Sequence, residues 1–349
     1  VSAFFGMSTI YAEATLAQQY KVKKDGEVTG GPVYYIRAAF KGTFGKALAA
    51  IFAILIVLAL GFTGNMVQSN SIGAAFSEVF SARNIEIPSI VFGLILAAVI
   101  GFIFLGGVNR LASVVEKIVP IMAGIYIVGS LVLILMNITA LPGAIKMIFV
   151  GAFNPEAVVG AGAGIAVREA IRFGVARGLF SNEAGMGSTP HAHARAKVEN
   201  PHKQGLAAMI SVFIDTFIIL NLTVFSILTT GVLDSGKEGT ALTQAAFTKG
   251  FGNFGDIFVA VCLLFFAFST ILGWHFFGEV NVKYLFGEKA AKFYSILVIG
   301  FVIVGSTLKV QLVWSLSDFF NGLMVIPNAI ALWALSGVVV KICKQYGKK

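Results

Sequence analysis

Long apolar runs constrain this chain more than any other feature of its sequence. Six of them continue without a charged residue over 47–77, 87–109, 118–145, 216–233, 257–278 and 319–340. A helix needs about 20 apolar residues to cross the hydrocarbon core of a bilayer. Together with an opening half-span at 1–20, a weaker run at 293–308 and a glycine-rich segment at 160–186, these runs predict nine crossings in one transmembrane domain over residues 1–349.

The low charge content excludes a soluble protein. Charged residues make up 12% of the chain and apolar residues 57%, whereas ordinary soluble domains carry about 25% charged residues. The net charge of +9 would otherwise suggest nucleic acid, but the charges are too few to cover a soluble fold or to read a polyanion. The two cysteines, Cys262 and Cys343, have no metal-ligand spacing.

The distribution of Lys and Arg predicts the orientation. Of 26 basic residues, 18 fall on one side of the predicted crossings and five on the other. The 18 lie in 21–46, at Arg110 and Lys117, and in 195–203, 283–292 and 341–349. Because cytoplasmic loops are enriched in Lys and Arg, we expect a multi-pass plasma-membrane protein with this side and the C-terminus in the cytoplasm. The first segment then runs inward, so we expect an earlier crossing that this sequence does not contain.

The segment 160–189 does not resemble an ordinary span. It reads GAGAGIAVREAIRFGVARGLFSNEAGMGST and combines many glycines with Arg168, Arg172 and Arg177. Glycine and charge both disfavour a lipid-facing helix, and irregular backbone at membrane depth is tolerated where it lines a cavity. We therefore expect a broken helix, with one half to roughly Ile171 and an irregular stretch around Gly174 to Ser181. The glycines at 160–164 are better explained by close helix packing.

Three motifs resemble the alanine or glycine:cation symporter family. They are GLFSNEAGMGSTPHAHARAKVENPHKQG (Gly178 to Gly205), FFGMSTIYAEATLA and GGPVYYI (Gly30 to Ile36). The resemblance covers the whole chain and implies an all-helical symporter of the LeuT type, with two five-helix inverted repeats. The nine crossings would be the second to tenth core helices, and the discontinuous helix at 160–186 the sixth. The first core helix, which carries half of the family's expected site, would be missing.

Spacing alone leaves the roles of several polar residues in the spans open. Gln68 either forms a hydrogen bond between helices or faces a cavity as a donor, and the resemblance favours contact with the amino acid. Ser269 and Thr270 either bond to their own helix or help to hold a cation, and the resemblance places them at a sodium site. Trp274 lies in mid-span, so we expect it to wall a site for a small side chain.

The signature implies the remaining site residues. We expect Gly178, Phe180, Ser181 and Asn182 to shape the substrate site. Acids at or near membrane depth are usually partners of an arginine or a helix end, and all are functional candidates. These acids are Glu13, Glu183, Asp215 and Glu279. Among them, Glu183 and Asp215 are candidates for gating or cation coupling.

The sequence thus predicts sodium-coupled symport of alanine or glycine by alternating access, without an organic cofactor and with the lipid bilayer as partner. A proton-coupled amino-acid transporter is the alternative, since a Ser/Thr pair does not name the ion. A passive channel and an intramembrane enzyme are less favoured, because no HExxH or GxSxG motif occurs. His191 and His193 are better explained by a solvated loop than by a metal site.

Overall fold

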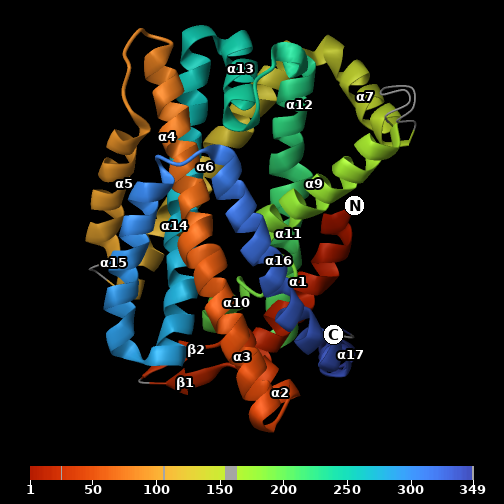
Figure 1. The fold of residues 1–349 in the computed structure, drawn as a ribbon. Helices are drawn as coiled ribbons and strands as arrows, with labels where there is room; N and C mark the ends of the chain where they lie inside the picture. Colours follow the sequence, from red (N-terminus) through yellow and green to blue (C-terminus); the bar gives the residue numbers. More distant parts are fainter. Residues whose placement is uncertain (25, 105–106, 154–162, 348–349) are drawn as a thin grey trace.

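A computed structural model describes the chain except residues 25, 105–106, 154–162 and 348–349 (Figure 1). The described part is helical apart from one short antiparallel hairpin. The first half contains α1 (Ser2–Gln19), β1 (Val22–Lys24), β2 (Glu27–Thr29), α2 (Pro32–Ala39), α3 (Gly42–Ile56), α4 (Asn65–Ser81), α5 (Ser89–Phe104), α6 (Gly107–Met136) and α7 (Leu141–Phe153). The second half contains α9 (Ala163–Asn182), α10 (Pro190–Arg195), α11 (Pro201–Val212), α12 (Asn221–Thr230), α13 (Gly239–Phe251), α14 (Gly255–Phe286), α15 (Glu288–Gly305), α16 (Val310–Ala334) and α17 (Ser336–Tyr346).

Two long helices contain π-helical segments. The segment η1 (Val57–Gly64) joins α3 to α4, and η4 (Phe213–Leu220) joins α11 to α12. In η1 the hydroxyl of Thr63 donates to the carbonyls of Leu58 and Ala59. Because π turns occur frequently at functional sites, η1 and η4 are candidate parts of such a site.

The apolar helices fit a polytopic membrane protein. By length and composition, five stretches of the described residues could cross a membrane, namely Gly42–Ser81, Ser113–Met136, Pro201–Thr230, Gly239–Phe286 and Val310–Ala334. The other predicted crossings fall on α1, α5, α9 and α15. The nine crossings remain a prediction.

Several predicted spans have wrong boundaries, and two of them illustrate the reason. The range 118–145 runs past the end of α6 at Met136 into a short 3-10 turn and α7. The range 319–340 starts inside α16 and crosses the helix end at Leu335 into α17. Both ranges were bounded by charged residues, but α16 continues through Asp318 because that carboxylate has an ion-pair partner, Arg177.

Two cavities lined by basic residues lie at elements on opposite ends of the bundle, where Figure 1 shows the β1–β2 hairpin and α13. A cavity at the end that carries β1, β2 and α2 is lined by Lys24, Arg195 and Lys283, which come from three separate connections. A second cavity at the end that carries α13 is lined by Arg83, Lys237 and Lys249. The structure therefore brings together the loops that the charge distribution assigned to each side. Which of these sides is cytoplasmic remains a prediction.

Candidate functional site

The helix that begins as α9 is broken after Asn182, and α10 begins at Pro190. Three residues of the intervening stretch have left-handed backbone, with φ of 55° at Glu183, 96° at Gly185 and 77° at Gly187. Glycine adopts positive φ at little cost, and the Asn182 side-chain oxygen accepts from the amide of Ala184 at 3.1 Å. The residues 183–189 are called the break below.

The predicted break was placed too early. The helix does not stop near Ile171 but runs without interruption through Gly174 and Ser181 to Asn182. Arg177, a charge that argued against a helix here, pairs with Asp318 of α16 and stacks over the ring of Trp314 at 3.9 Å. Gly178 lets α9 approach α1, since a Cβ there would lie 2.6 Å from the hydroxyl of Ser2.

Glu13 of α1 fixes the break in place. Its buried carboxylate accepts from the amides of Gly185 at 2.9 Å and Gly187 at 2.8 Å. The side-chain amide of Asn328 on α16 donates to the same carboxylate at 2.6 Å and to the carbonyl of Gly185 at 2.9 Å. Tyr35 of α2 in turn donates to Asn328 at 2.5 Å. Because a buried charge is costly unless it is hydrogen-bonded, this network holds three helices against the break.

Glu183 links the break to α14. One carboxylate oxygen accepts from the indole nitrogen of Trp274 at 2.7 Å, and the other accepts from the hydroxyl of Ser188. Glu183, the first residue of the break, therefore bonds to Ser188 near its end and also holds the ring of Trp274. Of the predicted gating or coupling residues, it is the one inside the break.

An aromatic cluster lies beside the break. Phe180 meets Trp274 edge to face at 5.2 Å and lies 4.8 Å from the ring of Trp314. Trp274 in turn rests on bare backbone, because a Cβ on Gly64 would lie 2.6 Å from the indole. Gln68 follows Gly64 by one turn of α4, so both lie on the same helix face. The structure thus brings Phe180 and Trp274 together. Gln68 lies one helical turn after Gly64, the residue that Trp274 contacts.

Ser181 and Asp215 meet between α9 and η4. The hydroxyl of Ser181 donates to the Asp215 carboxylate at 2.8 Å, and the hydroxyl of Thr216 donates to the same oxygen at 3.0 Å. Asp215 is half-buried and lies in the first turn of η4. The lone acid in this span is therefore stabilised by two hydroxyl groups.

Ser269 and Thr270 bond to their own helix. Both hydroxyls donate to the carbonyl of Phe266, at 2.9 and 2.8 Å respectively. The Ser269 hydroxyl also lies 3.8 Å from the sulfur of Met122. Each hydroxyl oxygen keeps lone pairs for a further partner, and Trp274 follows Thr270 by one helical turn. A sodium role for the pair is not tested by this geometry.

A cavity of about 410 Å³ opens against the break. Phe180 and Met186 line it from the α9 side, and Asp318 and Asn321 line it from α16. The side-chain oxygen of Asn321 is buried and has no hydrogen-bond partner in the described part of the chain. The cavity is large enough for a small molecule. No group of three or more His, Cys, Asp or Glu residues that could hold a metal ion occurs among the described residues.

Sequence reasoning missed several residues of this site. Asn328, Tyr35, Trp314 and Asp318 were not identified, and Glu13 was noted for its depth but given no role. A polar Asn next to a proline inside an apolar helix is the signal that could have found Asn328. Of the four acids at membrane depth, Glu279 does pair with a basic side chain, Lys283 at 3.0 Å.

Apolar helices long enough to cross a membrane, together with a broken helix, are typical of polytopic membrane transporters. The profile of the sodium:alanine symporter family matches residues 1–349. The chain belongs to this family, which confirms the resemblance of its motifs.

Named relatives are similar over the whole chain. The amino-acid carrier protein AlsT of Bacillus subtilis is 42% identical over 350 residues, which cover 100% of this chain and 72% of the relative. The sodium/alanine symporter AgcS of Methanococcus maripaludis is 39% identical over 354 residues, covering 100% of this chain and 76% of AgcS. The probable sodium/glutamine symporter GlnT of Bacillus subtilis is 40% identical over 351 residues, covering 100% and 71%. Together these matches support amino-acid:cation symport.

Proposed function

We propose that the protein carries a small neutral amino acid, alanine or glycine, across the plasma membrane together with sodium by alternating access. The observation that carries the proposal is the break, whose backbone is held by Glu13 and whose flank carries Phe180 and Trp274 beside a cavity. Broken helices expose free backbone groups that bind substrate and ion in many transporters. The similarity to AgcS, named for sodium and alanine, supports both substrate and ion.

The proposed substrate site combines residues on both sides of the aromatic cluster. Gly178, Phe180, Ser181 and Asn182 shape it from the end of α9, and Gln68 donates to the ligand from α4. Trp274 closes the site, and its contact with Gly64 leaves the bulky ring fixed against the substrate. The similarity to GlnT, named for glutamine, means that family membership alone does not set the size of the side chain.

For the ion, Ser269 and Thr270 are the proposed sodium ligands, and Glu183 and Asp215 the gating or coupling residues. Proton coupling is the second candidate, because Asp215 places a half-buried carboxylate next to the end of α9. In the proposed architecture the crossings form a LeuT-type five-plus-five inverted repeat, with α9 and α10 as the discontinuous sixth helix and the C-terminus in the cytoplasm.

The test is uptake of labelled alanine by the full-length protein in liposomes, driven by an inward sodium gradient. The double variant Ser269→Ala/Thr270→Ala should lose sodium-driven uptake. Thr229→Ala/Thr230→Ala on α12 is the matched control, since both of these hydroxyls also donate to carbonyls of their own helix. Equal sodium dependence of the wild type and the Ser269/Thr270 variant would refute the sodium site, and uptake driven by a proton gradient alone would favour proton coupling.

A further inference from the structure

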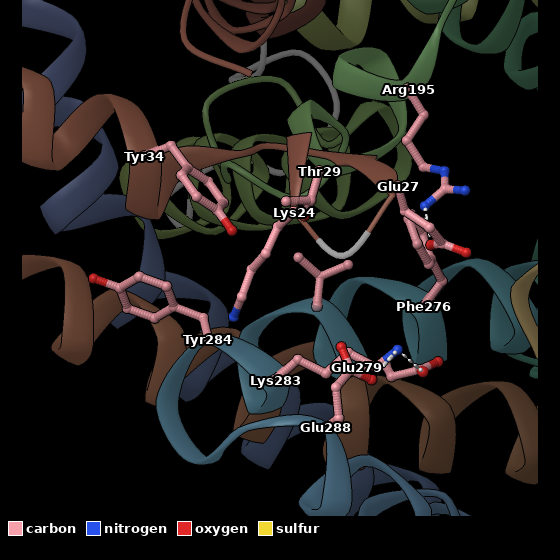
Figure 2. A pocket seen from close by; sticks show the side chains of 11 residues that line it. Lys24, Glu27, Thr29, Tyr34, Arg195, Phe276, Glu279, Lys283, Tyr284 and Glu288 are labelled. Carbon is pink, nitrogen blue, oxygen red and sulfur yellow. Dashed lines mark hydrogen bonds and ion pairs between the residues drawn. The ribbon is translucent and has the colours of Figure 1, made fainter. Parts of the chain in front are cut away.

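A charged cavity of about 230 Å³ lies at the end of the bundle that carries β1, β2 and α2, and none of its lining residues is among those proposed for substrate or sodium. The β1–β2 hairpin, α10, α14 and the start of α15 enclose it (Figure 2). Its walls carry three basic and three acidic side chains, namely Lys24, Arg195 and Lys283 together with Glu27, Glu279 and Glu288. A cavity with equal numbers of opposite charges does not select a simple anion or a simple cation.

The hairpin register decides which side chains face this cavity. Lys24 pairs with Glu27 and Val22 with Thr29, whereas Lys23 pairs with Val28. Successive side chains of a strand point to opposite faces. Lys24, Glu27 and Thr29 therefore share the cavity face and line the cavity, while Lys23 points away from it.

Among the described residues, ion pairing inside the cavity leaves one unmatched charge on each wall. Arg195 pairs with Glu27 at 3.1 Å. Lys283 contacts both Glu279 and Glu288 at 3.0 Å, which leaves an excess negative charge on α14 and α15. On the opposite wall, Lys24 forms no ion pair with any other described residue. Figure 2 shows the amino group of Lys24 directed from the hairpin into the space in front of α14.

Aromatic rings fill the walls between these two poles. Tyr34 and Tyr284 meet edge to face at 6.1 Å, and the guanidinium of Arg195 lies 5.8 Å from the ring centre of Phe276. Burial raises the pKa of Tyr34, so its hydroxyl keeps its proton and can donate to an anionic group. Separated poles with a phenolic donor near the positive pole suit a small molecule that carries both charges.

We propose that this cavity binds a zwitterionic amino acid, with its carboxylate at Lys24 and Tyr34 and its ammonium group at the oxygens of Glu279 and Glu288 that Lys283 does not contact. The choice of an amino acid rests on the proposed function, which supplies such a molecule at this end of the protein. The bound molecule ties the hairpin to α14 and α15. Because Glu27 of the same hairpin pairs with Arg195 of α10, occupancy also secures the segment that follows the break. The cavity is thus a second amino-acid site, separate from the substrate site.

Equilibrium dialysis of labelled alanine against the full-length protein in detergent tests this site. In sodium-free choline buffer we expect a component with a dissociation constant on the order of 1 mM, since the protein itself supplies the cationic partner. Lys24→Gln and Glu288→Gln should each weaken it by roughly ten- to a hundred-fold, as expected for a hydrogen bond to a charged group. Lys23→Gln on the opposite face of the same strand should leave it unchanged.

Competitors and a second variant complete the experiment. Glycine should displace the bound alanine, whereas acetate and methylammonium, which carry one charge each, should displace it poorly. The Ser269→Ala/Thr270→Ala variant should retain this component, so unchanged sodium-driven uptake in that variant would refute the proposed sodium site without affecting the dialysis result. Absence of sodium-independent binding, equal binding by Lys24→Gln, or displacement by acetate as effective as by glycine would each overturn the proposal.

Discussion

The chain around the break is held on one side by Glu13 and on the other by the β1–β2 hairpin, and the two attachments differ in their exposure to water. Glu13 is fully buried and bonds to two backbone amides and Asn328. The hairpin holds α10 through Glu27 and Arg195, whose side chains are 55% and 30% exposed. Exposed ion pairs contribute about 0 to 1 kcal/mol, whereas unsatisfied buried donors cost about 1 to 3 kcal/mol each. The break is therefore rigidly attached at Glu13 and weakly attached at the hairpin.

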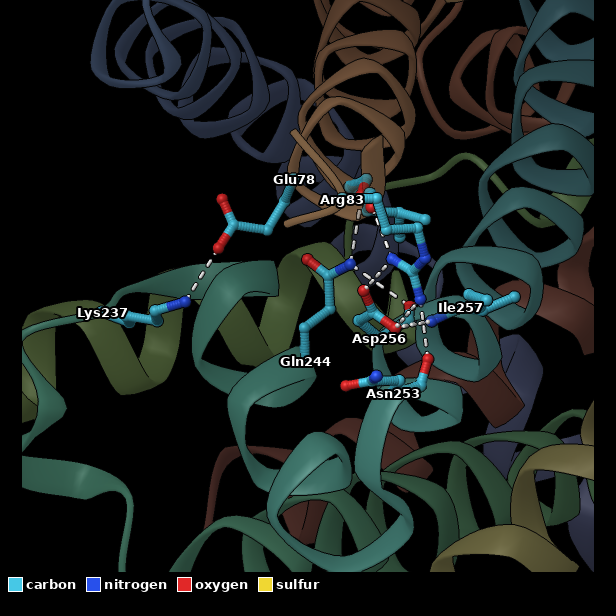
Figure 3. A network of polar contacts seen from close by, with 9 residues as sticks. Glu78, Arg83, Lys237, Gln244, Asn253, Asp256 and Ile257 are labelled. Atoms are coloured by element: carbon cyan, nitrogen blue, oxygen red, sulfur yellow. Dashed lines mark hydrogen bonds and ion pairs between the residues drawn. The ribbon is translucent and has the colours of Figure 1, made fainter. Parts of the chain in front are cut away.

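A third network shows the same contrast at the opposite end of the bundle (Figure 3). Arg83 donates to both carboxylate oxygens of Asp256, at 2.7 and 3.1 Å, and to the carbonyl of Asn253 at 2.7 Å. The side chain of Gln244 donates to carbonyls of α4 and α14. Bidentate arginine pairs are stronger than single contacts, so α4 and α14 are joined more firmly here than the hairpin and α10 are through Glu27 and Arg195.

The largest effect is expected from Glu13→Ala. The substitution leaves the amides of Gly185 and Gly187 buried without their acceptor, so the free energy of unfolding should fall by about 3 kcal/mol or more. Thermal unfolding of the full-length protein in detergent measures the change as a lower Tm. Glu27→Ala removes a carboxylate from the exposed Glu27–Arg195 pair in the same way. This variant should lower Tm only slightly. Equal losses in the two variants would refute the contrast between the attachments.

The next effect is expected from Trp274→Phe. Phenylalanine keeps an aromatic ring against Phe180 but removes the donor to Glu183, a loss of about 1.5 to 3 kcal/mol for a hydrogen bond to a charged group. Alanine uptake should slow and Tm should fall. Trp314→Phe is the control, because its indole nitrogen makes no hydrogen bond within the described residues. A Trp314→Phe variant as impaired as Trp274→Phe would show that ring size matters rather than the link to the break.

Gln18→Ala tests the connection between α1 and the end of α10. The side-chain amide of Gln18 donates to the carbonyls of His193 and Ala196, and its loss should cost about 1 to 2 kcal/mol. Hydrogen exchange should then quicken around residues 193–198 without quickening around Gly185 and Gly187. Gln19→Ala changes the exposed neighbour and should leave exchange unaltered, and faster exchange through the whole break would contradict separate attachments.

The smallest effect is expected from Arg195→Gln. Because the Arg195–Glu27 pair is partly exposed, its loss should lower the free energy of unfolding by less than about 1 kcal/mol. At 1 M salt, where the screening length is about 3 Å, the difference in Tm from the wild type should disappear. A difference that persists at high salt would show that Arg195 acts through a contact other than the exposed ion pair, such as the ring of Phe276.

Much of the fold follows from local sequence. The apolar runs locate the long helices because a bilayer demands length and low charge, and clustered Gly, Asn and Glu in 160–189 indicate that the helix there is broken. The position of the break was missed because Arg177 looked unsuited to a helix, and its partner Asp318 lies 141 residues away. Glu13 bonds to backbone amides 172 and 174 residues away, and no pattern in a single sequence indicates such a pairing.

The site was predicted less completely than the fold. Phe180 and Trp274 were chosen as neighbours of the substrate, and the structure does bring their rings together. Ser269 and Thr270 satisfy their hydroxyls within α14, so their proposed ion role depends on atoms beyond that helix. Contacts within one turn can be read from spacing, but contacts between helices require the packed structure.

The π segment η1 has a geometric consequence for the residues that follow it. A π turn holds more residues than an α turn, and each residue of an α-helix advances it by about 1.5 Å and roughly 100°. If η1 held one residue fewer ahead of Gly64, Gly64 and Gln68 would rotate together by about that angle relative to α3. The direction in which Gln68 points is therefore a matter of helix register, set ahead of it between Val57 and Gly64.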